Sequence, residues 1–327
     1  MKKLLLLAIV ALTVLAGCTK APVYKVGVGS VSSVQPRAAV VETAGRIRVN
    51  TTIATVVLDK DGKFVSVEID VAQQDGTFDV VGAIVKAEAA PTKKEKGAAY
   101  DMKKASAIGK EWDEQVKALE AWMIGKTLAE VKALPLTDGK VKDGEDLKSS
   151  VTITVTDYLA AVEKAVANAV ELENVAKVGG ASVSSIQPRA AVAETAGRIR
   201  VNVTFAAVAL DKDGKVIAAV VDTAQNDGTF DILGVIVKAE AAGTKKEKGA
   251  AYNMKSVSAI GKEVNEQIAA LEAWMAGKTL TEVKALPLTE GKIKDGEDLK
   301  SSVSVNVTDY LAAFEKAVGV AKDLAAK

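Results

Sequence analysis

The feature that most constrains this chain is an internal duplication. Residues 30–169 match residues 182–321 at a constant offset of 152 positions, without an insertion or a deletion. Roughly three quarters of the paired residues are identical, so the chain is a tandem repeat of one unit. A unit of about 140 residues is large enough to bury its own core, and two copies are too few for a solenoid. We therefore expect two homologous domains, each able to fold alone.

The first residues have the pattern of a lipoprotein signal peptide. Two lysines precede an apolar run over residues 4–16, and the sequence Leu-Ala-Gly-Cys then ends at Cys18, as lipoprotein signal peptidases require. A membrane-spanning anchor is the alternative, but thirteen apolar residues at about 1.5 Å each reach roughly 20 Å, short of a bilayer core of about 30 Å. We expect Cys18 to carry a lipid and to hold the protein at the cell membrane or outer surface, on the extracytoplasmic side.

The leader and the duplication together divide the chain into five segments. We expect a signal peptide over 1–17, a lipid-anchored tether over 18–29, a first repeat domain over 30–169, a linker over 170–181 and a second repeat domain over 182–327.

The composition excludes several classes of function. The sequence has no histidine, which removes the commonest general base and the commonest metal ligand, and its one cysteine is Cys18. The mature domains therefore have no internal disulfide, and we expect neither an enzyme nor a metal site. The net charge is +1 and the charges are mixed along the chain, so we expect no nucleic-acid partner.

The first half of each unit has the pattern of a β-hairpin. Strand-like residues 46–58 and 64–72 flank the sequence Asp-Lys-Asp-Gly-Lys at 59–63, whose Asp-Gly step suits a tight turn. A calcium loop is the alternative for the two aspartates, but the later ligands of an EF-hand are missing.

The second half of each unit has helical periodicity. Apolar residues recur from Trp112 to Met123 at helical spacing, and capping boxes begin at Thr127 and Thr279. A short strand over 150–154 and a last helix over about 157–166 follow. The fold class we predict is α+β, with each domain a small, mostly antiparallel sheet carrying helices on one side.

All six arginines lie in one segment of each unit, and lysine is used elsewhere. Arginine offers a rigid fork for phosphate or carboxylate, and two arginines two apart on a strand share a face, so an anion site is one interpretation. A solvated strand face with Glu42 as a partner is the other. The pairs concerned are Arg46 with Arg48 and Arg198 with Arg200.

Three further groups of residues have two interpretations each. The segment 92–100 is kept in both units and supplies Lys93, Tyr100, Lys245 and Tyr252, either as ligand contacts or as a soluble loop. Hydroxyls at Ser150, Thr152, Ser302 and Ser304 suit a phosphate or an ordinary turn. Tryptophans at 112, 122 and 274 suit stacking on a planar cofactor, although a place in a helical apolar stripe favours the core.

The order of these motifs resembles that of surface lipoproteins of anaerobic bacteria that contain, or accompany, FMN-binding-like domains. The motifs are the hairpin around Asp-Lys-Asp-Gly-Lys, the sequence Lys-Lys-Glu-Lys-Gly-Ala-Ala-Tyr-Asp-Met, a long helix, and Ser-Ser-Val-Thr before a final helix. The resemblance spans about residues 30–320. It implies FMN as the cofactor, a redox partner protein, and an accessory role in flavin-based electron transfer.

The covalent form of that family esterifies FMN to a threonine in a Ser/Thr-Gly-Ala-Thr motif, which this sequence lacks. Its nearest counterpart is residues 149–152, and the second copy ends in Ser304. The resemblance therefore implies non-covalent FMN near the residues named above. The alternative function is a cofactor-free surface protein that binds a ligand or adheres, in which duplication raises avidity.

Overall fold

The computed structural model describes residues 22–324. Its fold class is α+β, with antiparallel sheets and helices, as the sequence predicts. Cys18 and the predicted signal peptide lie outside the described residues.

The two repeats have the same order of elements. The first contains β1 (Val23–Arg37), β2 (Gly45–Leu58), β3 (Phe64–Phe78), β4 (Ile84–Lys86), α1 (Lys93–Lys96), η1 (Gly97–Tyr100), α2 (Trp112–Met123), α3 (Leu128–Lys132), β5 (Leu136–Thr137), β6 (Lys140–Val141), η2 (Asp146–Ser149), α4 (Thr156–Ala167) and β7 (Val170–Glu173). The second contains β8 (Lys177–Arg189), β9 (Gly197–Leu210), β10 (Val216–Phe230), β11 (Ile236–Ala239), α5 (Lys245–Lys248), η3 (Gly249–Tyr252), α6 (Val264–Met275), α7 (Leu280–Lys284), β12 (Leu288–Thr289), β13 (Lys292–Ile293), η4 (Asp298–Ser301), α8 (Thr308–Gly319) and β14 (Lys322–Asp323).

Each repeat forms one five-stranded antiparallel sheet. The strand order is β4-β3-β2-β1-β7 in the first repeat and β11-β10-β9-β8-β14 in the second. Along β2, side chains alternate between two cores: Ile47 and Val49 face the other sheet, whereas Ala54 and Val56 belong to the core under the helices. Each sheet therefore has helices on one face only.

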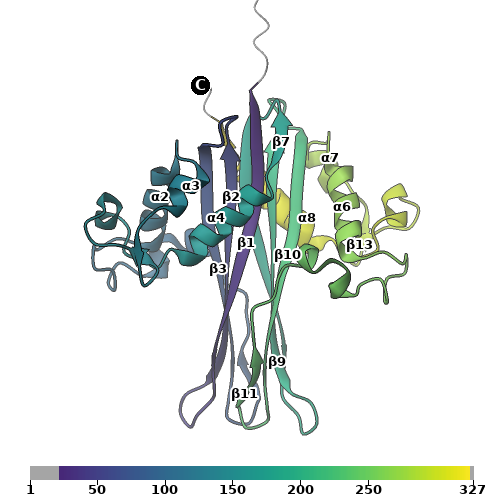
Figure 1. The fold of residues 1–327 in the computed structure, drawn as a ribbon. Coiled ribbons are helices and arrows are strands. Elements are labelled where there is room, and N and C mark those ends of the chain that lie inside the picture. The colour runs from purple at the N-terminus through teal and green to yellow at the C-terminus, as the bar shows by residue number, and fades with distance from the viewer. Residues whose placement is uncertain (1–21, 325–327) are drawn as a thin grey trace, which may run out of the picture.

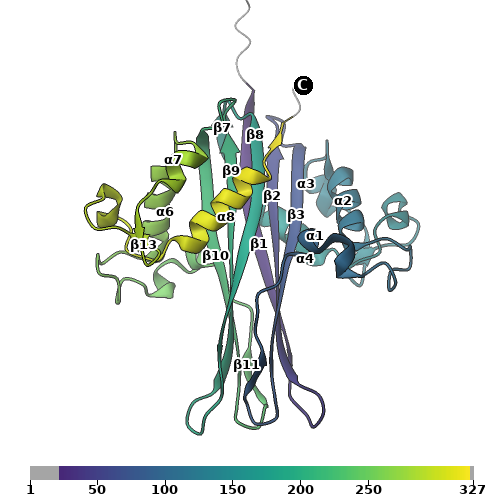
Figure 2. The same ribbon diagram turned by 180° about the vertical axis from the view of Figure 1, so that it is seen from behind.

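One long helix lies directly on the backbone of each sheet. Helix α4 crosses the first sheet and α8 crosses the second (Figures 1 and 2). A Cβ at Gly27 would lie 2.0 Å from the carbonyl oxygen of Ala165, and a Cβ at Gly29 would lie 2.4 Å from the amide nitrogen of the same residue. Glycine is needed at both positions because the helix backbone occupies the space of a side chain.

The inner faces of the two sheets pack against each other and share a core. The rings of Phe78 and Phe230 stack with centroids 3.7 Å apart, and each comes from a different repeat. Ile199 packs against Gly76, and Ile47 packs reciprocally against Gly228. A pseudo-twofold relation between the repeats follows from these reciprocal contacts.

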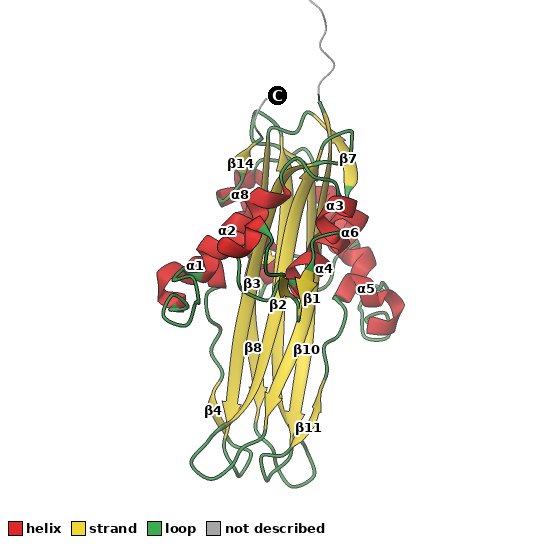
Figure 3. Cartoon of the chain, turned by 60° about the vertical axis from the view of Figure 1, so that its left-hand side comes forward, coloured by secondary structure: helices red, strands yellow, loops and turns green. Residues whose placement is uncertain are grey.

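The helices surround only the end of the sheets nearest the N-terminus. Beyond them the long strands continue as a narrow stem that ends in four loops, at 38–44, 79–83, 190–196 and 231–235 (Figures 1 and 3). We call these four loops the tip. The turns at 59–63 and 211–215 lie at the opposite end of the strands.

Several sequence predictions are confirmed. The hairpin turn at 59–63 joins β2 to β3, and the predicted helix from Trp112 to Met123 is α2. Thr127 and Thr279 cap α3 and α7 with complete capping boxes, in which the hydroxyl and the glutamate each accept a backbone N–H bond. The final helix is α4, one residue longer at each end than predicted.

The predicted segment boundaries need correction. Residues 23–29, predicted as tether, form the start of β1, where Val26 and Val28 are buried. Residues 170–181, predicted as linker, contain β7 and the start of β8, so that only residues 174–176 connect the repeats. The end of the sequence repeat shows only where the two copies stop being similar. The sheet continues beyond that point, because a further segment pairs with it as an edge strand.

The predicted strand over 150–154 is also wrong. The structure has the short helix η2 followed by extended residues, with a single bridge between Lys140 and Thr154. The expectation that each unit folds alone did not anticipate the core between the sheets, which needs residues of both repeats.

Candidate functional site

A cleft lies on the helical face of the first sheet, where polar side chains of β1, β2 and β3 meet α1, η1 and the N-terminal ends of α2 and α4. It consists of two adjoining cavities of about 340 and 530 Å³ that share Lys93, Thr154 and Tyr158. Each volume lies in the range typical of small-molecule sites. We call it the first-repeat cleft.

Three aromatic side chains form one wall of this cleft. Trp112 is buried, and its indole N–H donates to the hydroxyl of Tyr158 at 2.8 Å. Trp112 meets Tyr158 and Tyr100 edge to face, with ring centroids 6.1 and 6.5 Å apart. The Tyr100 hydroxyl donates to Gln73 at 3.1 Å, and burial raises the pKa of Tyr158 to about 12. The wall is therefore a fixed, neutral aromatic surface at physiological pH.

Lys93 extends over that wall. Its ammonium lies 4.9 Å from the centroid of Tyr100 and 5.4 Å from the ring of Trp112. Burial, with a second contribution from Arg48, lowers the pKa of Lys93 to about 8. Among residues 22–324 this ammonium has neither an ion-pair partner nor a hydrogen bond. A partly desolvated cation in this state favours an anion at its head.

The residues lining the cleft carry an excess of positive charge. Arg48, Lys93, Lys140 and Lys148 are the cations, and Asp157 is the one carboxylate in the two cavity linings. Arg48 is paired with Asp75, and Lys148 pairs with Asp143 at 3.1 Å and donates to the carbonyl of Val141 at 2.9 Å. Lys93 and Lys140 then stand against Asp157 alone, so the cleft attracts anionic ligands more than cationic ones.

The predicted arginine pair is only partly available for a ligand. Arg48 lines the cleft, but both ends of its fork donate to Asp75 at 2.7 Å, which raises its pKa. Arg46 is on the same strand face and its Nε is buried without a hydrogen-bond partner in the part of the chain that is described. The predicted two-arginine clamp on one phosphate thus has one member already paired.

The predicted hydroxyls serve the frame of the cleft. Thr152 lines the cleft, and its amide and hydroxyl both donate to the side-chain oxygen of the buried Gln115, at 2.9 and 3.2 Å. The Ser150 hydroxyl accepts from the ammonium of Lys110 at 3.3 Å. Gln115 in turn donates to Ser106, so the loop before α2 and the segment between η2 and α4 are both tied to the first turn of α2.

The second repeat brings its predicted residues together in the same way. Arg200 is paired bidentately with Asp227, and Lys245 lies 5.5 Å from the ring centroid of Tyr252. Ser304 donates to Gln267, Ser302 accepts from Lys262, and Arg198 has an unpartnered Nε within the described residues. The main change in the wall is that valine replaces tryptophan at 264, so the buried hydroxyl of Tyr310 lacks the indole partner that Tyr158 has.

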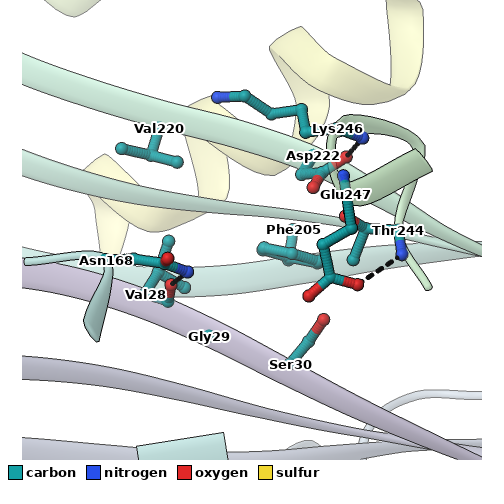
Figure 4. A pocket seen from close by; sticks show the side chains of 10 residues that line it. All are labelled: Val28, Gly29, Ser30, Asn168, Phe205, Val220, Asp222, Thr244, Lys246 and Glu247. Atoms are coloured by element: carbon teal, nitrogen blue, oxygen red, sulfur yellow. Dashed lines mark hydrogen bonds between the residues drawn. The ribbon is translucent and has the colours of Figure 1, made fainter. Parts of the chain in front are cut away.

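A different cavity, of about 370 Å³, lies at the seam between the repeats (Figure 4). There Asp222, whose pKa is raised by burial, accepts from the amides of Thr223 and Lys246 at 2.7 and 3.1 Å. The ammonium of Lys246 binds Glu272, and Glu247 pairs with Lys164 of the first repeat at 2.7 Å. The charged groups here are paired with one another, so the seam is a structural junction rather than an open ligand site.

Two searches of residues 22–324 add no further site: no cluster of three acidic or other metal-ligating side chains is present, and no helix has the length and apolarity to cross a bilayer. No family model, curated protein or solved structure matches the chain. The function must therefore be argued from the geometry.

Sequence reasoning missed Tyr158 and Gln115 as members of the site, and it weighed Trp112 as a stacking residue but favoured the core. Trp112 belongs to an apolar stripe, which favoured a place in the core, and it is indeed buried. Its indole nonetheless forms the back of the cleft, because the first turn of α2 lies at the edge of the core. The available signal was the recurrence of tyrosine at 158 in the last helix beside polar residues.

Proposed function

We propose that the chain is a lipid-anchored, extracytoplasmic binding protein made of two tandem domains behind a cleaved signal peptide, and that the first-repeat cleft binds a planar anionic ligand. FMN is the ligand we propose to test first. Cys18 would carry the anchor, and a redox partner protein would exchange electrons with the bound flavin.

The observation that carries this proposal is the unpaired ammonium of Lys93 over an aromatic wall. An aromatic surface favours a flat ring system, and a desolvated cation favours a phosphate or carboxylate on the same ligand. The cavity volumes and the excess of lining cations support the same chemistry.

The residues present fit FMN held non-covalently. Lys93 and Lys140 would face the phosphate, and Tyr100 with Met102 would flank the ring; bound flavin would supply one- and two-electron chemistry that the side chains lack. The hydroxyl of Thr152 is bonded to Gln115, and the sequence lacks the motif for esterification, so no covalent link is proposed.

The test is titration of the protein with FMN and with riboflavin. Replacement of Lys93 by glutamine removes the charge, so FMN affinity should fall roughly tenfold or more, at about 1.4 kcal/mol per decade, while riboflavin affinity changes little. Lys103→Gln is the matched control, because Lys103 is an exposed lysine on the adjacent loop. Equal loss of both flavins, or no binding of either by the wild type, would refute an FMN site.

The cofactor-free alternative has a distinct result in the same experiment. A protein that is colourless as purified, binds neither flavin, and still binds a component of the cell envelope would be a surface binding or adhesive module. The absorbance spectrum before and after denaturation distinguishes the two at once.

A further inference from the structure

Hairpin turns of identical geometry stand at the two ends of the long strands. At 59–63, Asp59 accepts the amides of residues 61 and 63 at 3.0 Å, and Gly62 has a φ of 74°. At 79–83, Asp79 accepts the amides of residues 81 and 83 at 3.0 and 2.8 Å, and Gly82 has a φ of 70°. The second repeat builds the same pair of turns with Asp211 and Asp231.

The two ends differ in the residues at the centre of these turns. The turn near the N-terminal end carries Lys-Asp in both repeats, whereas the turn at the tip carries Val80-Val81 in the first and Ile232-Leu233 in the second. Because the turn geometry is shared, geometry does not explain the apolar pair. Apolar side chains at the centre of an exposed turn face water, so their presence in both repeats points to a contact surface.

The neighbouring loops enlarge this apolar surface. Val41 is 81% exposed, Leu233 is 66% exposed and Val81 is 63% exposed. Val40 is exposed in the same loop as Val41, and Val192 is exposed in the remaining loop. All four loops lie together at the end of the stem (Figure 3).

The tip is held as one body by bonds between the repeats. The amide of Ala39 donates to the carbonyl of Gly234 at 2.9 Å, and the amide of Ala191 donates reciprocally to Gly82 at 2.9 Å. A Cβ at either glycine would lie 2.6 Å from the methyl group of the facing alanine. The apolar side chains therefore project from a pre-organised platform.

Four guanidinium groups lie directly behind the apolar side chains. Arg37 and Arg46 flank the loop 38–44, and Arg189 and Arg198 flank the loop 190–196. Among described residues none of these four makes an ion pair; Arg37 and Arg189 donate only to backbone carbonyls, at 2.9 Å. The four loops also contain Glu42, Asp79, Glu194 and Asp231, so the charges at the tip balance.

We infer that the tip docks on a lipid bilayer surface. From the tip inward, apolar side chains come first, and the arginines follow roughly 10 Å behind them at about 3.3 Å per residue. A tip inserted into a leaflet would therefore place its apolar side chains among the acyl chains and its arginines at the level of the phosphates. Arginine binds phosphate bidentately, which suits lipid headgroups at that depth. The tip lies at the end of the strands opposite the N-terminus, so a molecule held through Cys18 would present it to a second bilayer and not to the leaflet that holds the anchor. The surface is independent of the first-repeat cleft, which lies on the helical part of the molecule.

The inference is tested with a chain that starts at residue 19, which keeps every described residue and has no acylated cysteine. Its binding to vesicles of phosphatidylcholine, alone or mixed with phosphatidylglycerol, is measured by flotation. The tip variant Val80→Lys, Val81→Asp, Ile232→Lys and Leu233→Asp copies the polar turn that the chain already uses at 60–61 and 212–213. We expect it to bind vesicles roughly tenfold or more weakly than the wild type.

The matched control removes exposed apolar residues elsewhere. Ile124→Lys with Val257→Lys changes two exposed side chains on the helical part, and vesicle binding should stay within about twofold of the wild type. Both variants should keep the wild-type unfolding transition. Because the charges at the tip balance, phosphatidylglycerol should strengthen binding less than the apolar side chains do.

A second readout locates the contact. A tryptophan placed at Leu233 should be quenched by lipids brominated in the acyl chain, whereas one placed at Val257 should not. The inference is overturned if the wild type floats with neither vesicle, if the tip variant binds as well as the wild type, or if the tip mediates dimerisation without lipid, which would make a second copy the occupant.

Discussion

The two repeats share their strands, caps and turns but differ at the back of the cleft. In the first repeat Trp112 bonds the hydroxyl of Tyr158, whereas in the second repeat Val264 leaves Tyr310 without that partner. Burial raises the pKa of both tyrosines, so both hydroxyls are neutral at physiological pH. The comparison teaches that the duplicated frame is retained while the aromatic wall within it has diverged, and for this reason our proposal places the ligand in the first repeat.

The largest expected effect comes from separating the repeats. A chain limited to residues 22–174 or 175–324 exposes the inner sheet face, including Phe78 or Phe230, that the partner repeat covers. We expect each half to lose the cooperative monomeric transition of the full chain, or to pair with a second copy through the same face. Urea unfolding and light scattering measure the two results. A stable monomeric half would show that the repeats are independent domains after all.

The next effect is expected from exchanging the residue that distinguishes the clefts. Trp112→Val should lower the free energy of unfolding by about 3 kcal/mol, because it leaves a cavity and an unbonded Tyr158 hydroxyl. Val264→Trp should cost less, about 1–2 kcal/mol, because the larger ring overpacks a buried site but breaks no hydrogen bond of the wall. Urea denaturation gives both values, and equal losses would contradict a specific role for the indole.

The pH dependence of ligand binding in the first repeat should follow the protonation of Lys93. A phosphate needs the protonated form of Lys93, whose lowered pKa is about 8, so FMN affinity should be highest below pH 8 and fall as the pH rises through that value. The decrease should reach roughly tenfold at most, by about 1.4 kcal/mol per decade. Titration calorimetry between about pH 6.5 and 9.5, in steps of roughly half a pH unit, measures this decrease in affinity. If the FMN affinity of the Lys93→Gln variant still falls over this pH range, a group other than Lys93 carries the titrating proton.

The smallest effect should be the same in both repeats. Thr127→Ala and Thr279→Ala each remove the N-cap of an equivalent short helix, so each should lower the free energy of unfolding by about 1 kcal/mol. Thermal unfolding of the two variants in parallel measures this. A clear inequality would mean that divergence extends beyond the cleft wall to the frame.

Local features of the fold were predictable from the sequence, because they depend on neighbouring residues. The turn at 59–63, the helix from Trp112 and the caps at Thr127 and Thr279 each rest on interactions within about four residues, and all are confirmed. The extent of β1 and β7 was not predictable in this way. Residues 23–26 pair with 170–173, and residues 25–29 pair with β2, so both segments become strands through partners that are distant in the sequence.

The site was predictable only in part, for the same physical reason. Arg48, Lys93, Tyr100 and Thr152 do lie together, which the recurrence of their motifs in both repeats suggested. Pairing of Arg48 with Asp75 depends on the register between β2 and β3, and hairpin patterning alone does not supply it. The packing of one sheet on the other was likewise not predictable from the sequence. A strand face buried against a second sheet and an apolar strand face exposed to solvent produce the same two-residue alternation of apolar side chains.

The connection between β7 and β8, at residues 174–176, keeps the two inner sheet faces permanently close. Tethering through so short a segment holds each face at an effective concentration of about millimolar or higher relative to the other, so even a weakly self-associating surface stays assembled. In a dimer of two identical chains, each with a single repeat, every substitution would occur in both halves. Covalent fusion removes that symmetry constraint, and one half is free to keep a binding wall while the other drifts as a scaffold.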